Sequence, residues 1–135
     1  MKTYDQLRFS LLTEFKLKAE PHLQSLWSDL TELEAASDEF ALCLARGHVL
    51  QRLRALSEAA GAANAWEVRM FSLALGFLVA TTTQVRDAAN YERFDALYRK
   101  ARKLTEALNA IQAPPPLSER ERQPTETVLV LSCAD

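Results

Sequence analysis

The sequence contains few residues that form tight turns, with 3 glycines and 5 prolines among 135 residues. Sandwiches and barrels usually need more glycine, because their many turns use backbone conformations that glycine adopts most easily. The scarcity therefore argues against an all-β fold. Alanine, leucine, glutamate and arginine are abundant instead, and these residues favour helix.

An excess of one charge is also missing, since 16 Lys and Arg residues face 18 Asp and Glu residues. Dedicated nucleic-acid binders rely on many Lys and Arg contacts to phosphate, so we expect no nucleic-acid binding by this chain. Cys43 and Cys133 lack any CxxC or Cys/His ligand spacing, and we therefore expect no metal site and no cofactor. Both thiols are expected to be reduced, with Cys43 a small core residue.

No hydrophobic run is long enough to span a bilayer. The longest, from about Leu73 to Ala80, is interrupted by Gly76 and is far shorter than the roughly 20 residues required. The first residues lack the apolar core and cleavage site of a signal peptide. We therefore expect a cytoplasmic protein without membrane contact.

Apolar residues recur at three- and four-residue steps in four stretches, which predicts amphipathic helices. The first helix should run from about Tyr4 to Ala36. Its apolar register continues through Pro21, so we expect a kink rather than a break. The pair Ser37-Asp38 is a good start for the second helix. The expected core positions of the two helices are Leu12, Phe15, Ala19, Leu23, Leu26, Leu30, Leu33, Leu42, Ala45, Val49, Leu53, Leu56 and Ala60.

The third helix should be apolar nearly all round, and we therefore expect it to be the most buried of the four. It should end between Thr81 and Val85, because β-branched threonines disfavour helix. Its apolar residues are Val68, Met70, Phe71, Leu73, Leu75, Phe77, Leu78 and Val79. The fourth helix has one apolar stripe, formed by Phe94, Leu97, Ala101, Leu104, Leu108 and Ile111. Four such helices with short connections predict an all-α, antiparallel four-helix bundle.

The composition changes after the fourth helix, where Pro114-Pro115-Pro116 should end the bundle. We expect the bundle over residues 1–112 and an extended, polar linker over residues 113–126. The apolar run from Val128 to Leu131 is typical of a strand buried on both faces. A lone strand has no partners, so residues 127–135 are expected to begin another, truncated domain.

Two stretches resemble histidine phosphotransfer (HPt) domains. Residues 7–26, which include Pro21, are similar to the long first helix of that family, where a proline is common near this position. Residues 53–64 (LRALSEAAGAAN) are similar to its active helix, whose usual pattern is His-x-Leu-Lys-Gly, then small residues and another Gly. Leu56 and Ala59-Ala60-Gly61 match that register. The resemblance covers about Leu7 to Ile111 and implies an HPt-like bundle.

The residues that perform the chemistry of HPt domains are replaced in this register. In that family an exposed imidazole attacks the aspartyl phosphate of a receiver domain. Here Arg54 occupies the histidine position, Ser57 the lysine position and Glu58 the glycine position. Arginine cannot accept a phosphoryl group, because its guanidinium stays protonated. The resemblance thus implies a degenerate HPt module, not an enzyme, that docks a receiver domain or a sensor kinase.

His48 is an alternative phosphoryl acceptor, since the sequence from His48 to Gln51 reads His-x-Leu-Gln. Arg52 then stands where the glycine belongs. His48 lies six residues before Arg54 and hence on another side of the helix. We expect either an active HPt domain that uses His48 or a docking face alone, and His22 should be an ordinary surface residue. The expected docking residues are His48, Gln51, Arg52, Ser57 and Glu58.

The C-terminal residues allow two interpretations. Residues 127–135 resemble the first strand of a receiver domain, although Ser132 and Cys133 stand near the places of the paired acids that hold Mg²⁺ in active receivers, and only Asp135 is acidic. Alternatively, residues 116–122 are similar to the opening of a LuxR-type helix-turn-helix, and residues 91–101 to part of a tetratricopeptide repeat. That pair would indicate the helical sensor region of a transcription regulator, but Pro124 is unfavourable for the DNA-binding helices.

Overall fold

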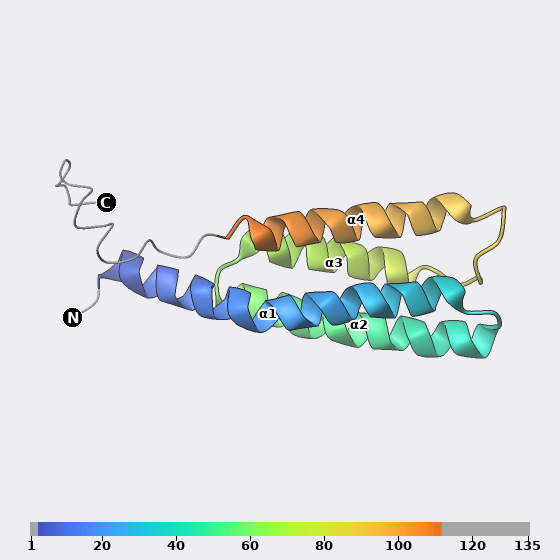
Figure 1. Cartoon of the computed structure of the whole chain (residues 1–135), viewed down its shortest axis with the longest axis horizontal. Coiled ribbons are helices and arrows are strands. Elements are labelled where there is room, and N and C mark those ends of the chain that lie inside the picture. Colours follow the sequence, from blue (N-terminus) through green and yellow to red (C-terminus); the bar gives the residue numbers. More distant parts are fainter. Residues whose placement is uncertain (1–2, 112–135) are drawn as a thin grey trace.

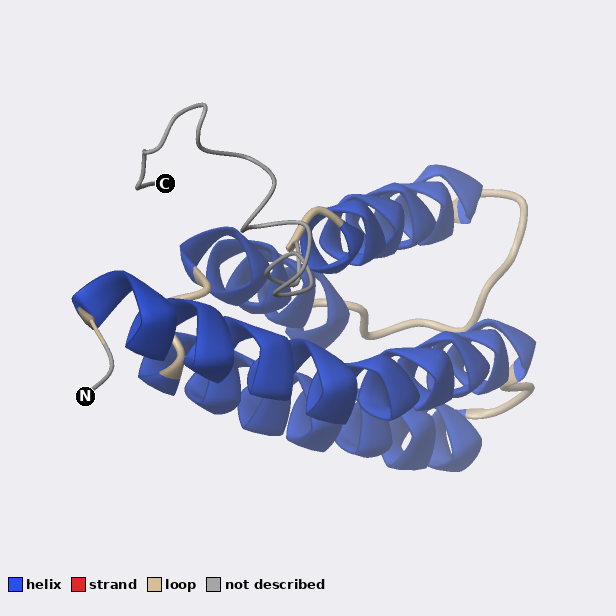
Figure 2. Ribbon diagram, turned by 60° about the vertical axis from the view of Figure 1, so that its left-hand side comes forward, coloured by secondary structure: helices blue, strands red, loops and turns tan. Residues whose placement is uncertain are grey.

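The computed structural model describes residues 3–111, which form four helices: α1 (Tyr4–Ala35), α2 (Glu39–Ala62), α3 (Trp66–Ala80) and α4 (Tyr91–Asn109). Successive helices run in opposite directions, and α1 also contacts α4 (Figure 1). The described part contains only helices and loops, the longest loop joining α3 to α4 (Figure 2). The predicted antiparallel four-helix bundle is confirmed. The expected linker, the expected strand and Cys133 lie outside the described residues.

The first helix is continuous through Pro21, as predicted, and it bends gently near its middle (Figure 1). A proline inside a helix removes one backbone donor and crowds the preceding turn, which explains a bend at this place. The helix begins with a capping box. Thr3 Oγ1 accepts from the Gln6 amide at 3.2 Å, and Gln6 Oε1 accepts from the Thr3 amide at 2.9 Å.

The two turns that border α2 are determined by its terminal residues. At the start, the Asp38 carboxylate accepts from the Ala41 amide at 2.8 Å, which satisfies an otherwise unpaired helix donor. At the end, Asn64 adopts a left-handed conformation with φ of 59°, which asparagine tolerates better than most residues. The Ala65 amide then reaches back to the Ala60 carbonyl at 2.8 Å, so the chain reverses tightly into α3.

The predicted core positions of α1, α2 and α4 are buried, apart from Leu12 and Ile111, which are half-buried. One apolar stripe from each of these helices faces the bundle axis, as the three- and four-residue spacing requires. Burial of these stripes is the main favourable term for the fold. Within residues 3–111, no helix combines the length and the apolar character needed to cross a bilayer.

The prediction that α3 is the most buried helix is wrong. Its core side is narrow and consists of Val68, Ser72, Leu75 and Val79. Its opposite side faces solvent and carries four large apolar residues: Trp66, Met70, Leu73 and Phe77. In a closed bundle of four helices each helix contacts only its two neighbours, α2 and α4 for α3. Nothing in the described bundle therefore covers the outer side of α3, however apolar it is.

A line of paired polar and aromatic groups joins α1 to α4. The Trp27 and Tyr98 rings stack with their centroids 5.9 Å apart, and Trp27 Nε1 donates to Thr105 Oγ1 at 3.0 Å. The Tyr98 hydroxyl donates to Glu34 Oε1 at 2.7 Å. Burial, together with the hydrogen bond to this carboxylate, raises the pKa of Tyr98 to about 12. These groups thus lie at a helix contact with their hydrogen bonds satisfied.

Candidate functional site

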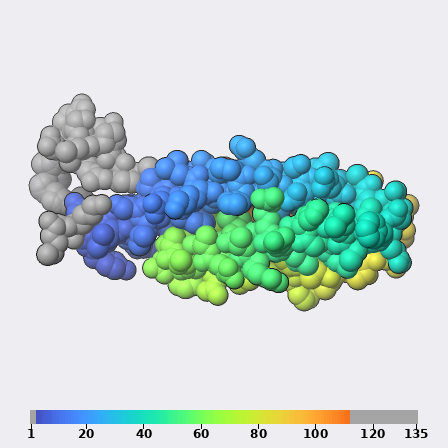
Figure 3. Space-filling view, turned by 90° about the horizontal axis from the view of Figure 1, so that it is seen from below, coloured from blue at the N-terminus to red at the C-terminus, as the bar shows by residue number. Residues whose placement is uncertain are grey.

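The outer side of α2 carries three of the expected docking residues. His48, Gln51 and Glu58 are all exposed, and their spacing places them on the side of α2 that faces away from the core. Figure 3 shows α2 on the face turned toward the viewer, with α1 above it. Glu58 lies ten residues after His48, which is about 15 Å along a helix axis. Its carboxylate is therefore too distant to act chemically on the His48 imidazole.

Arg52 lies at the border between α2 and α1 rather than on the open face. Its Nε donates to Asp29 Oδ2 at 2.8 Å, and both side chains are mostly buried, with 30% and 15% of their area exposed. The guanidinium is thus held by a carboxylate of the neighbouring helix. We conclude that Arg52 links α1 to α2 and is not a free cation beside His48.

His22 is exposed, as the sequence predicted, and it also belongs to the same cluster. Its Nδ1 lies 3.4 Å from Arg52 NH1, a distance suited to a hydrogen bond in which the guanidinium donates. Because a guanidinium has only donors, Nδ1 is the acceptor in this contact. The sequence contains one signal for this contact. His22 and Arg52 each lie 15 residues from Ser37, which is at the middle of the turn between α1 and α2. Residues at equal distances from such a turn lie at the same level of two antiparallel helices.

The three residues at the HPt-like positions do not share one exposed face. Arg54 and Glu58 are exposed, whereas Ser57 is buried and donates its hydroxyl proton to the Arg54 carbonyl at 3.0 Å. The expectation of an exposed Ser57 is therefore incorrect. Around the helix it lies about 120° from Gln51 and about 100° from Glu58, which places it beside the buried stripe rather than on their exposed side. The open face accordingly comprises His48, Gln51, Arg54 and Glu58.

Cys43 also differs from its predicted place. It is exposed rather than part of the core, and its Sγ lies 3.9 Å from Arg46 NH2. The buried stripe of α2 passes through the adjacent residue, Leu42, so the next side chain is rotated away from the axis. Within residues 3–111 no group of three His, Cys, Asp or Glu side chains is placed to bind a metal ion together.

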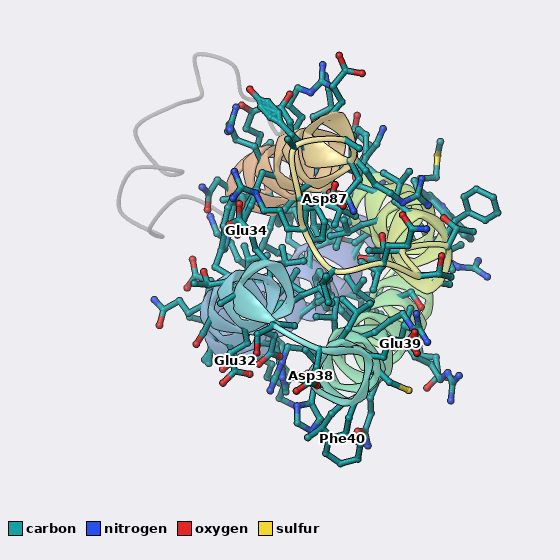
Figure 4. All side chains as sticks on the ribbon, turned by 90° about the vertical axis from the view of Figure 1, so that its right-hand side faces the viewer. Glu32, Glu34, Asp38, Glu39, Phe40 and Asp87 are labelled. Atoms are coloured by element: carbon teal, nitrogen blue, oxygen red, sulfur yellow. The ribbon has the colours of Figure 1, made fainter. Side chains whose placement is uncertain are left out.

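The end of the bundle near the α1–α2 turn is rich in carboxylates, and Phe40 extends away from it into solvent (Figure 4).

The loop before α4, at the same end of the bundle, borders an open hollow of about 780 Å³. Arg86, one of the residues that line this hollow, pairs with Glu34 at 3.0 Å. The hollow is lined by Arg86, Asp87, Ala88, Ala89, Tyr91 and Glu92. All six of these residues are exposed, and the hollow does not reach the face of α2.

Fold and surface together define a small antiparallel helical bundle, with exposed polar residues along the outer side of α2 from His48 to Glu58 and an apolar stripe on α3. No protein-family model, curated protein or solved structure matches the chain. Its function must therefore be inferred from its own residues.

Proposed function

We propose that this bundle is a non-catalytic docking module of a two-component, phosphorelay-type signalling protein. In this proposal it binds a receiver domain, or the sensor kinase that phosphorylates one, through the open face of α2. The observation that carries the proposal is the position of Arg54. It stands exposed where the HPt resemblance puts the phosphoryl-accepting histidine, on a helix whose apolar register is otherwise intact.

Arg54 gives such a face a physical means of recognition. A guanidinium is permanently charged and forms paired hydrogen bonds to carboxylates and phosphates. Receiver domains present acidic groups at the place where an HPt histidine reacts. An exposed arginine there would attract these groups without accepting the phosphoryl group. Gln51 and Glu58 would supply hydrogen-bonding groups on the same face.

The alternative of an active HPt domain rests on the exposure of His48. Its expected cationic helper, Arg52, is held by Asp29 at 2.8 Å. A phosphoryl group on His48 would thus gain less from Arg52 than from a free cation. This geometry favours docking over transfer.

The alternative of a repeat-containing sensor region receives less support from the helix contacts. Helix pairs in a repeat solenoid contact only the pairs beside them. Here the first and last helices of the described part contact one another, and the four helices have unequal lengths of 32, 24, 15 and 19 residues. This arrangement supports a closed bundle.

The docking proposal is tested by titrating the full chain with receiver domains, with and without the phosphate mimic beryllofluoride, by calorimetry. Arg54→Glu should weaken binding about tenfold or more, since tenfold corresponds to about 1.4 kcal/mol. Arg102→Glu on α4 is the matched control, because it makes the same charge change at another exposed arginine. Absence of binding by the wild-type chain, or equal losses in both variants, would overturn the proposal.

Phosphotransfer is tested separately by incubating the chain with a phosphorylated receiver and measuring acid-labile phosphate. We expect no labelling of the wild-type chain. Stoichiometric labelling that His48→Gln abolishes would replace the docking proposal with an active HPt domain.

A further inference from the structure

The outer side of α3 is an apolar stripe without a cover in the described bundle. Its four large side chains, Trp66, Met70, Leu73 and Phe77, are 54%, 66%, 54% and 69% exposed. Their spacing of four, three and four residues aligns them along one side of the helix. This spacing is the one that two packed helices use for the seam between them. We name these four residues the α3 stripe.

The α3 stripe is not needed for the fold of the single chain. The opposite side of α3 already supplies its core contacts, through residues such as Leu75 and Val79. The largest apolar patch on a typical monomer measures roughly 300–600 Å² and is often a site of interaction. The stripe therefore calls for a partner with an equally apolar, elongated surface.

We propose that this partner is a second copy of the chain, bound through its own α3 stripe with the two α3 helices antiparallel. The spacing of the stripe is symmetric about its centre. Trp66 and Phe77 are equally distant from it, as are Met70 and Leu73. In an antiparallel pair each aromatic residue at one end would thus face the other aromatic residue of the partner copy, and Met70 would face Leu73. A two-fold contact requires this kind of self-complementary surface.

Charge around the stripe also favours the antiparallel alignment. Glu67 and Arg69 border its first turn, where the Arg69 guanidinium lies 5.6 Å from the centroid of the Trp66 ring. The last turns of α3 contain no charged residue. In an antiparallel pair the charged end of each copy meets the uncharged end of the other. A parallel pair would bring the like ends of the helix dipoles together, whereas Glu67 and Arg69 give each first turn no net charge.

The available area is sufficient for a weak dimer. With roughly 150–250 Å² for a large apolar or aromatic side chain, the exposed fractions correspond to roughly 500 Å² per copy. Two stripes would therefore bury roughly 1,000 Å² in total, which is near the lower limit for a specific interface. We expect a dimer that dissociates in the micromolar range.

The test is the mass of the full chain in solution, measured by sedimentation velocity over a concentration series under reducing conditions. The wild-type chain should shift from monomer to dimer as concentration rises. Leu73→Glu and Phe77→Glu should remain monomeric, with unchanged helical content by circular dichroism. Phe40→Glu is the matched control, because Phe40 is 78% exposed but lies on α2 away from the stripe; this variant should still dimerise.

A wild-type chain that stays monomeric at sub-millimolar concentration would overturn the proposal, as would a dimer that survives both α3 substitutions. Loss of the dimer in Phe40→Glu alone would place the contact elsewhere. His48→Gln and Arg54→Glu should leave the dimer intact, since they lie on the open face of α2. Failure of this proposal is thus distinguishable from failure of the docking proposal.

Cross-linking tests the alignment of the two helices. In a Cys43→Ser, Cys133→Ser background, Trp66→Cys and Phe77→Cys chains are oxidised separately and after mixing. The antiparallel alignment predicts a disulfide-linked species mainly in the mixture, because two copies of position 66 would lie about 16 Å apart along the axis. Cross-linking of each variant with itself, with no increase on mixing, would contradict the alignment.

Discussion

The outer sides of α3 and α4 differ sharply, although the helices are neighbours and each buries one side in the core. Leu75 of α3 and Leu97 of α4 are both fully buried. On the outer side, α3 carries the α3 stripe, whereas α4 carries charged residues. The exposed charged residues of α4 are Glu92, Asp95, Arg99, Arg102, Lys103 and Glu106. The core thus requires one apolar side of each helix, and the outer side is apolar in α3 but charged in α4.

This difference separates the residues that fold the bundle from those that serve another purpose. The single apolar stripe of α4 is fully used within one chain, and its charged side suits water. At the border between the two helices, Lys100 Nζ lies 5.6 Å from the centroid of the Phe71 ring, so a side chain of α4 partly covers α3. This contact covers only the side of α3 that borders α4. The α3 stripe beyond it has no cover among residues 3–111 and is the surface that we propose for association.

The largest expected effect compares the two sides of α3 itself. Leu75→Ala removes a fully buried side chain and should lower the free energy of unfolding by about 2–5 kcal/mol. Leu73→Ala truncates the same side chain on the exposed stripe and should change it by less than about 0.5 kcal/mol. Both are measured by urea denaturation at a concentration where the chain is monomeric.

A similar loss in both variants would show that the α3 stripe stabilises the single chain and that the comparison with α4 is incorrect. Leu97→Ala provides the control on α4. It should match Leu75→Ala, because both leucines are fully buried.

Sequence periodicity predicted the bundle well because burial in a closed bundle follows the helical repeat. It identified the core stripes of α1, α2 and α4, and the continuous α1 through Pro21. It failed at α3 because an apolar side chain shows that burial would be favourable, not that a neighbour is present. Cys43 was misplaced for a related reason. It directly follows the buried Leu42, and one residue along a helix turns the side chain by about 100°, away from the core.

The candidate site was predictable only in part. The exposed positions of His48, Gln51 and Glu58 follow from the helical repeat once the buried stripe is known. The repeat also places Ser57 beside the buried stripe, directly after Leu56, which the alignment with the HPt motif did not take into account. The contacts of Arg52 with Asp29 and His22 join two helices, and their pairing depends on where the turn between them lies.

A smaller effect concerns the flank of α4 that packs on α1, where polar groups replace the apolar contacts of α3. Tyr98→Phe removes the hydroxyl that donates to Glu34 and should lower the free energy of unfolding by about 1 kcal/mol. Glu34 keeps its 3.0 Å pair with Arg86, so its carboxylate is not left alone. The measurement is urea denaturation at neutral pH. An unchanged or higher stability would show that the hydroxyl contributes nothing.

The same residue predicts a pH dependence. The pKa of Tyr98 is about 12 in the folded chain, above its ordinary value of 10.0. The folded chain holds the Tyr98 proton more tightly than the unfolded chain does. The resulting contribution to the free energy of unfolding is therefore complete below pH 10 and is lost as the pH rises toward 12. Because the group is partly accessible to solvent, we expect this loss to be at most about 1 kcal/mol. Between these pH values the free energy of unfolding should fall less steeply in Tyr98→Phe than in the wild-type chain. Parallel curves of unfolding free energy against pH would contradict the prediction.

The smallest effect is expected on the outer side of α4. Arg99 Nε lies 3.2 Å from Asp95 Oδ2, and both side chains are more than half exposed. Exposed pairs of this kind stabilise a helix by about 0.3–0.5 kcal/mol. Because alanine has a higher helix propensity than arginine, the substitution offsets part of that loss. Arg99→Ala should thus change the free energy of unfolding by less than about 0.5 kcal/mol, and the difference should shrink further in high salt. Urea denaturation at low and high salt measures both. A large loss would mean that the charged side of α4 stabilises the bundle, and the contrast with α3 would then no longer separate folding from association.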